Sequence, residues 1–181
     1  MLKRTRIIFL STILVMTLQV YASAGSLGIT RSEQQKSNWC WAACAKMIGN
    51  YYGKTITQSN IVEYVKGDYN NNDVANMYEA NSALIYASDM STEFDGVLSL
   101  SEVKREIDDG DPIEIRIGWD GGTLMRGHFL VVGGYRISSI RIIDPATSSS
   151  GSKYFTYSAL INGADLDSGS NACWTHSIVI L

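Results

Sequence analysis

Apolar residues recur at helical spacing in the first half of the chain and at strand spacing in the second half. The helical spacing predicts helices over 39–52, 61–66, 74–87 and 100–108. The alternating pattern predicts strands over 113–117, 128–135 and 140–143, with further strand-like or mixed segments over 154–161 and 174–181. Helices followed by strands indicate an α+β fold, in which an N-terminal helical part packs on a C-terminal antiparallel β-sheet.

Capping residues mark several of these helix boundaries. Ser37 and Asn38 are suitable N-caps for the first helix, and Gly53 suits a left-handed cap after its end. Ser99 and Glu102 have the spacing of a capping box for the fourth helix.

The segment after the second predicted helix is rich in Asn and Asp. Asp68, Asn70, Asn72 and Glu79 occupy positions 1, 3, 5 and 12 of a calcium-loop pattern. Position six is Asp73, where that pattern needs glycine for its sharp turn. We therefore interpret the segment as a loop in which Asn72 or Asp73 caps the next helix, and we expect no cofactor.

The first predicted strand alternates isoleucines with Glu114 and Arg116, which is the pattern of a half-buried strand. After it, residues 118–127 form a predicted flexible loop that contains Trp119 and a Gly-Gly pair. The strand over 140–143 is expected to return antiparallel to the strand over 128–135 through a turn at 136–139.

Residues 1–24 have the features of a secretory signal peptide. Three basic residues precede the apolar run 7–20, and Ala22-Ser23-Ala24 supplies a small-x-small cleavage site. The run is short for a membrane span and contains polar residues, so we expect no stable membrane anchor after cleavage near Ala24. The sequence thus predicts a secreted protein, periplasmic or extracellular, with a polar arm over 25–33 and one domain over 34–181.

Charge excludes one class of partner. Removal of the signal peptide takes away three positive charges and moves the formal net charge from −3 to −6. No basic stretch remains, which argues against nucleic acid as a partner.

Cys40 is the candidate nucleophile, because it stands in the first turn of the first predicted helix. Unpaired backbone N–H groups and the positive end of the helix dipole favour a thiolate at that position. Gln34 lies six residues upstream, and its amide can donate to an oxyanion in front of the same helix end. A buried cysteine on an ordinary amphipathic helix is the alternative.

Candidates for the base and for its orienting acid are few. His128 opens an apolar strand directly after Gly127, where one ring face can look into a cleft. His176, the competing base, shares a predicted strand face with apolar residues. Asp144 follows the strand that returns from His128, so a tight hairpin brings the two residues to the same end of the sheet. Asp120, in the glycine-containing loop, is the alternative acid.

The motif Gln-x5-Cys-Trp-Ala, then Gly127-His128-Phe129, then Asp144-Pro145, resembles the papain-like cysteine peptidases. The match is to their compact bacterial branch with a Trp-Cys-Trp-Ala-Ala motif, and it covers nearly all of the chain after residue 33. The resemblance implies that Cys40 is the nucleophile, His128 the general base and acid, and Asp144 the group that orients His128. It also implies an oxyanion hole made by Gln34 and the Cys40 backbone N–H, and a protein or peptide substrate. Papain has asparagine at the orienting position, so Asp144 is a mild departure.

Two other functions are compatible with the same residues. A cell-wall amidase, transglutaminase or acyltransferase can use the same Cys-His-Asp order on a different bond. A binding or toxin-like module on this scaffold with a silent site is the other reading. Because a long inhibitory propeptide does not fit before residue 34, we expect restraint by an inhibitor, an export partner or narrow specificity.

The other cysteines and the tryptophans leave alternatives open. Cys44 and Cys173 can form a disulfide or remain buried thiols. Trp41 is predicted to be core, and Trp39 to lie nearer the cleft.

Overall fold

The computed structural model describes residues 24–181, so the predicted signal peptide lies outside the described residues except for Ala24. The helices are α1 (Cys40–Tyr51), α2 (Gln58–Lys66), α3 (Met77–Ser88), α4 (Leu100–Asp109), α5 (Trp119–Gly122) and α6 (Tyr157–Asn162). The strands are β1 (Ala24–Ser26), β2 (Thr92–Asp95), β3 (Ile113–Gly118), β4 (Gly127–Arg136), β5 (Ser139–Ile143), β6 (Ser152–Thr156), β7 (Ala164–Leu166) and β8 (Gly169–Ile180). Within 24–181, no helix is long and apolar enough to cross a membrane.

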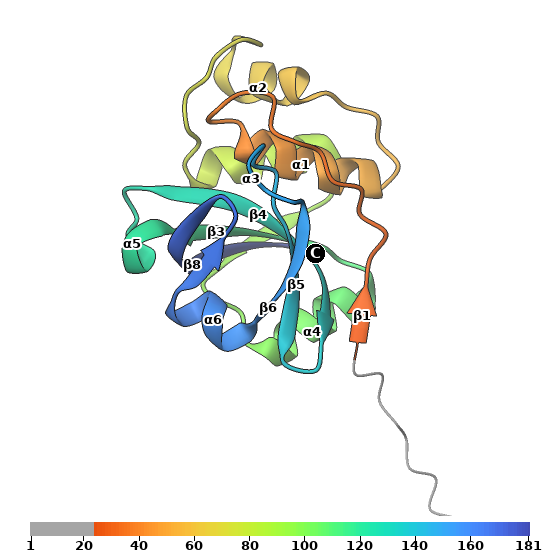
Figure 1. Cartoon of the computed structure of the whole chain (residues 1–181). Helices are drawn as coiled ribbons and strands as arrows, with labels where there is room; N and C mark the ends of the chain where they lie inside the picture. The colour runs from red at the N-terminus through yellow and green to blue at the C-terminus, as the bar shows by residue number, and fades with distance from the viewer. Residues whose placement is uncertain (1–23) are drawn as a thin grey trace, which may run out of the picture.

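The strands form an antiparallel sheet in the order β2-β8-β3-β4-β5-β6, with β1 added beside β4 and β7 beside β8. Helices α1, α2 and α3 lie together on one side of this sheet, and α4 and α6 lie on the other (Figure 1). The predicted α+β fold, with a nucleophile-bearing helical part on an antiparallel sheet, is confirmed. The fourth helix differs, because it covers the opposite face of the sheet.

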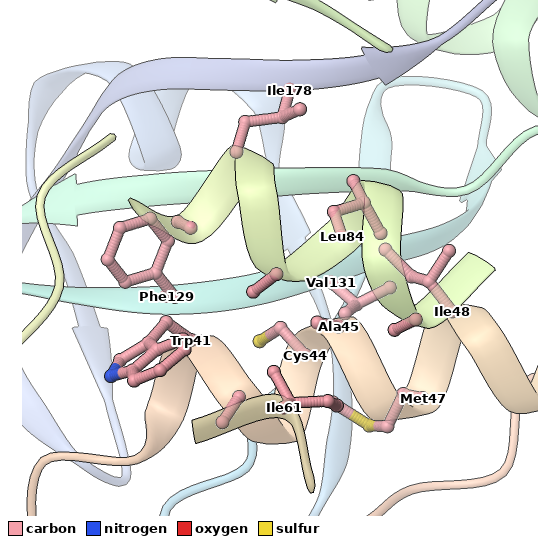
Figure 2. Close-up of a cluster of buried hydrophobic side chains, with 14 of the residues drawn as sticks. Trp41, Cys44, Ala45, Met47, Ile48, Ile61, Leu84, Phe129, Val131 and Ile178 are labelled. Atoms are coloured by element: carbon pink, nitrogen blue, oxygen red, sulfur yellow. The ribbon is translucent and has the colours of Figure 1, made fainter. Parts of the chain in front are cut away.

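Helix α1 is fixed to the sheet by a continuous apolar core. Cys44 and Ile48 of α1 pack with Phe129 and Val131 of β4 and with Ile178 of β8 (Figure 2). All five side chains are buried. Complete burial of a side chain of this size contributes about 1.5–3 kcal/mol, so the position of α1 over β4 is strongly determined.

Helices α1 and α3 approach each other closely at Gly49. A Cβ atom at this position would lie 2.4 Å from the carbonyl oxygen of Ala87, which is far inside van der Waals contact. Ala80 and Ala83 also face this core from α3. Small residues on both helices therefore set the distance between them.

The end of α1 and the start of α4 follow the predicted caps. Gly53, after the end of α1, has the predicted left-handed conformation, with a φ of 79°. Ser99 accepts from the backbone N–H of Glu102, and the Glu102 side chain accepts from the backbone N–H of Ser99, which is the predicted capping box. Helix α2 begins three residues earlier than predicted, because Thr57 forms a capping box with Asn60.

The predicted N-caps of α1 are wrong. The N-cap is Trp39, with no side-chain capping bond. Ser37 and Asn38 instead bond to Asn72, whose side-chain amide donates to the Ser37 hydroxyl and whose carbonyl accepts from the Asn38 amide. The Asn-rich loop therefore holds the segment before α1, a long-range role that local capping rules do not foresee.

The predicted cap of α3 at Asn72 or Asp73 is also wrong. The N-cap is Asn76, which forms a capping box with Glu79. The Glu79 carboxylate accepts from the Asn76 backbone N–H and from Lys66 Nζ, so the last position of the calcium pattern is committed to the protein. Over residues 24–181, no three acidic, histidine or cysteine side chains gather as a metal site.

Strand β3 is buried on both faces, so the prediction of a half-buried strand is wrong. Its isoleucines pack under α4 and α6, and Glu114 on the other face is fully buried. In the pairing of β3 with β8, the register shifts by one residue: Arg116 pairs with His176 and Ile117 with Trp174. Thr175 is the extra residue of this β-bulge.

The N-terminal arm is not a free polar segment. Ala24, Gly25 and Ser26 form β1 against β4, and Ile29 is buried in the core over α1. Strands β2 and β7 lie in segments for which we predicted no strand. The mixed segment predicted over 154–161 is resolved into the end of β6 followed by α6.

Candidate active site

Cys40 is the first residue of α1, and its side chain lines a cavity of about 650 Å³ together with His128. As the first helical residue it has no intrahelical acceptor for its backbone N–H. The backbone N–H groups of Trp41 and Phe129 donate to its sulfur. The thiol thus accepts from two peptide N–H groups at the start of a helix, an environment that favours negative charge.

His128 links the thiol to a carboxylate. Its ring hydrogen-bonds to Cys40, and its Nε2 lies 2.8 Å from Asp144 Oδ1. Because Nε2 is used by Asp144, Nδ1 is the nitrogen left for the sulfur. The structure therefore brings the three predicted residues together, with His128 between Cys40 and Asp144.

Asp144 is held in place by other bonds. The backbone N–H of Ala146 donates to Oδ1 at 2.8 Å, and the Ser168 hydroxyl donates to Oδ2 at 2.6 Å. The Asp144 carbonyl accepts from Arg31 Nε at 2.7 Å. Ser168 lies in the turn between β7 and β8, a polar loop whose sequence carries no signal for this contact.

The electrostatics of the three residues reinforce one another. Burial raises the pKa of Cys40, but the charge of His128, its hydrogen bond and the two backbone N–H groups lower that pKa below its ordinary value. Burial lowers the pKa of His128, but the Cys40 thiolate and the Asp144 carboxylate raise it well above its ordinary value. Burial raises the pKa of Asp144, but bonds to His128 and Ser168 lower it overall. The pair Cys40 and His128 is thus poised as thiolate and imidazolium.

Gln34 has a different environment from the one predicted for an oxyanion donor. Its Nε2 donates to the carbonyl oxygens of Lys36 and Ser37, at 2.9 and 2.8 Å. Its backbone N–H donates to the carbonyl of Pro145, the residue next to Asp144. Gln34 does not line the cavity. As placed, it fastens the loop before α1 to the end of β5, and its role toward an oxyanion stays a prediction.

Aromatic residues shape the cavity around the histidine. The Trp119 ring stacks near the His128 ring, with centroids 6.1 Å apart and 19° between the planes. The prediction that Trp41 belongs to the core is confirmed, because its side chain is fully buried in the core under the site, where it also lines the cavity. The prediction that Trp39 lies nearer the cleft is wrong, because Trp39 is buried away from the cavity and donates to the Asn71 carbonyl.

The alternative base, His176, and the alternative acid, Asp120, do not bond to Cys40 or to His128. His176 also lines the cavity, opposite Arg116, but its hydrogen-bond and charge partners do not include Cys40. Because of the bulge at Thr175, His176 does not share a face with Trp174, which packs in the opposite core. Asp120 is exposed and lies 4.0 Å from Arg126, far from the role of orienting acid.

All three cysteines are free thiols, so the disulfide between Cys44 and Cys173 is not formed. Cys44 is fully buried in the core below the site. Burial raises its pKa well above the ordinary value, and nearby acidic groups add to this effect. Cys44 is therefore an inert core residue, in contrast to Cys40 one helical turn away.

The comparisons with known proteins agree with this geometry. The model of the Peptidase_C39 like family matches residues 26–175. A protein from Bacillus anthracis named as a C39-like peptidase has a similar structure, with 12% identity, a TM-score of 0.61, and coverage of 87% of this chain and 97% of that one. The peptidase domain of Streptococcus ComA, a bifunctional ABC transporter, gives 15% identity, a TM-score of 0.58, and coverage of 84% and 97%.

A third similar structure is a double glycine motif protease from an AMS/PCAT transporter in complex with the leader peptide. It gives 17% identity, a TM-score of 0.59, and coverage of 87% of this chain and 95% of that one. Among curated proteins no sequence matches the chain. Identities this low show a shared fold, whereas the family match spans most of the sequence. The chain therefore belongs to the Peptidase_C39 like family and is a cysteine peptidase.

Proposed function

We propose that the protein is an exported peptidase that hydrolyses peptide bonds through Cys40, His128 and Asp144. The observation that carries the proposal is the position of His128, whose ring bonds to the Cys40 thiol on one side and to Asp144 on the other. A histidine with a purely structural role would not require a cysteine thiol as the partner of its second ring nitrogen. The thiol, in turn, has a pKa lowered by His128 and by two backbone N–H groups, which favours the nucleophilic thiolate.

The reaction proceeds in two steps. The Cys40 thiolate attacks the scissile carbonyl carbon, and the imidazolium of His128 gives its Nδ1 proton to the amine as the C–N bond breaks. Water then attacks the resulting thioester while His128 takes up its proton, and the Cys40 thiolate leaves. The Cys40 backbone N–H is a donor for the oxyanion in both steps. Gln34 is proposed as the second donor, a role for which its Nε2 gives up its bond to the Lys36 or the Ser37 carbonyl.

The substrate class that we propose is a peptide or protein. The similar double glycine motif protease was solved with a leader peptide, which supports peptide binding to this fold. The cavity beside Cys40 is about 650 Å³, large enough for several side chains of an extended peptide. Export is proposed from the basic residues, the apolar run and the small-x-small site at the N-terminus.

The test uses the mature protein and three variants, Cys40→Ala, His128→Ala and His176→Ala, each first checked for folding. We expect hydrolysis of a peptide library by the wild type and by His176→Ala, and none by the other two. A folded His128→Ala protein with wild-type turnover would overturn the assignment. Digestion of peptidoglycan without digestion of peptides or casein would favour a cell-wall amidase instead.

A further inference from the structure

One wall of the active-site cavity is cationic, although the protein as a whole is acidic. Two arginines, Arg116 and Arg126, line the cavity, and none of its lining residues is Asp or Glu. The formal net charge of the whole chain is −3. A local concentration of positive charge beside the catalytic thiol therefore calls for an explanation from function.

Arg116 is the central group of this wall. It lies on β3 between Phe129 of β4 and His176 of β8, which pair with it from the two sides. A Cβ atom at Gly127 would lie 2.4 Å from the Ile117 carbonyl oxygen and 2.6 Å from Arg116 Nη2, so the guanidinium packs directly against this glycine. Because Gly127 directly precedes His128, the guanidinium lies against the backbone that carries the catalytic base.

The guanidinium is held in a defined position. Its Nη2 donates to the Leu124 carbonyl at 2.8 Å, and its Nη1 donates to the Thr175 hydroxyl at 3.3 Å. Thr175 is the bulged residue of β8, and its hydroxyl donates in turn to the Arg116 carbonyl. These contacts use two of the five N–H donors of an arginine.

Arg116 has no carboxylate partner within residues 24–181, unlike Arg31, Arg105 and Arg126, which all have one. The side chain is only partly exposed, and burial lowers its pKa more than the charge of the Cys40 thiolate raises it. The thiolate therefore compensates the partly buried guanidinium only in part, and an uncompensated charge is unfavourable. A planar fork with free donors is the arrangement that binds a carboxylate in a bidentate manner.

His176 adds a second polar atom at the same place. Its Nδ1 is buried, with no hydrogen-bond partner in the described part of the chain. Burial and the neighbouring Arg116 lower its pKa, so the ring is neutral at neutral pH. One tautomer of the neutral ring has an Nδ1–H that can donate to an acceptor in the cavity.

We propose that Arg116 and His176 form a subsite for a carboxylate of the peptide substrate, close to the scissile bond. This inference rests on the proposed function. The carboxylate belongs either to a Glu or Asp side chain or to the C-terminus of a short peptide. Since Cys40 lines the same cavity, the recognised group lies within a few residues of the bond that is cut.

The experiment compares peptides that differ only in charge. N-acetylated, C-amidated peptides carry either Glu or Gln at each position around the cleavage site, and a third set is neutral with a free C-terminal carboxylate. We expect kcat/KM to be at least about tenfold higher for Glu at one position, because hydrogen bonds to a charged acceptor are stronger than those to a neutral amide. A preference for the free C-terminus instead would identify a terminal carboxylate as the ligand.

Variants assign the preference to the subsite. Arg116→Gln should make the Glu and Gln peptides equivalent, and Arg116→Lys should retain only part of the preference because the fork is lost. Arg136→Gln, at the opposite end of β4, is the matched control and should keep the wild-type ratio. A Glu preference that survives in folded Arg116→Gln, or a wild type without any carboxylate preference, would overturn the subsite.

Binding to Cys40→Ala separates this inference from the proposed function. Calorimetry with the same peptides should show tighter binding of the carboxylate peptide, weakened by added salt. If Arg116→Gln does not fold, two other measurements decide the question. The first is the preference of the wild type for the carboxylate peptide over the neutral one and its decrease with added salt. The second is the same preference in His176→Ala, which should be smaller. A wild type that hydrolyses no peptide while Cys40→Ala still prefers the carboxylate would refute the peptidase function and retain the subsite. Equal binding of all peptides would refute the subsite.

Discussion

Nε2 of His128 lies 2.8 Å from Oδ1 of Asp144, although the two residues are sixteen positions apart in the sequence. The contact exists because β4 and β5 form a hairpin whose turn lies between Arg136 and Ser139. His128 stands at the start of β4 and Asp144 directly after β5, so both lie at the same end of the hairpin, beside Cys40 at the start of α1. The carboxylate fixes the ring so that Nδ1 is directed to the thiol.

Asp144→Asn should lower kcat/KM by about 100-fold, within the range contributed by general acid–base groups. The amide retains the shape of the carboxylate but not its charge, so the pKa of His128 falls and that of Cys40 rises. The measurement is a pH series of peptide hydrolysis and of Cys40 alkylation, in which the alkylation midpoint should move to higher pH. Ser168→Ala, which removes only one bond to Asp144, is the milder control. An unchanged midpoint in Asp144→Asn would contradict this account.

Iodoacetamide at pH 6.5 should modify Cys40 in the folded protein and leave Cys44 untouched. The pKa of Cys40 is lowered by His128, whereas burial raises that of Cys44, and only the thiolate reacts. Mass mapping of the modified peptides checks this directly. Cys44→Ala should keep peptide hydrolysis and lose about 1 kcal/mol of stability from a small core cavity. Labelling of Cys44 at the same rate as Cys40 would show that the core is open.

Gly49→Ala should destabilise the protein by about 1–3 kcal/mol, the usual cost of overpacking a core. The added methyl group would meet the Ala87 backbone, which cannot move without shifting α3. Urea unfolding at neutral pH measures the change. Gly28→Ala is the matched control, because a Cβ there meets nothing within 4 Å. Equal effects of the two substitutions would contradict the close approach of α1 and α3.

The residues that the sequence could identify are those with local signals. Cys40 follows from a helix start, and His128 and Asp144 follow from strand ends joined by one tight turn. The carboxylate subsite has no such signal. Arg116 points away from the isoleucines of β3 by simple alternation, but its neighbour His176 lies on the cavity side apart from Trp174 because of the bulge at Thr175, whereas alternation alone places His176 with Trp174.

Long-range contacts also account for the errors at helix starts. Ser37 and Asn38 satisfy local capping rules, yet Asn72, more than thirty residues away, takes their hydrogen bonds. Local helix-capping propensity cannot predict these bonds to Asn72, because they depend on where the loop that carries Asn72 packs. Glu114 illustrates the same limit, since alternation with isoleucine suggested a half-buried strand and α1 covers the second face.

Glu114→Gln should stabilise the protein progressively as pH rises above the ordinary carboxyl pKa of about 4.3. Glu114 is fully buried under α1, and neither carboxyl oxygen has a hydrogen-bond partner within residues 24–181. Burial, with the nearby Cys40 charge, raises its pKa well above the ordinary value. The folded protein therefore keeps a proton that the unfolded chain releases. The proton's contribution to stability is complete below about pH 4.3 and is lost as pH rises toward the folded-state pKa.

The loss for a single group reaches at most about 1.4 kcal/mol per pH unit in this window. Urea unfolding from pH 4.5 to 8 of the wild type and of Glu114→Gln measures it, because the glutamine side chain does not titrate. We expect the difference in the free energy of unfolding to grow with pH in favour of the variant. Glu106→Gln is the control, because it removes another buried carboxylate, one that is paired with Arg105, and leaves Glu114 in place. A difference for Glu114→Gln that is constant with pH would show that the buried carboxyl is ionised in the folded protein.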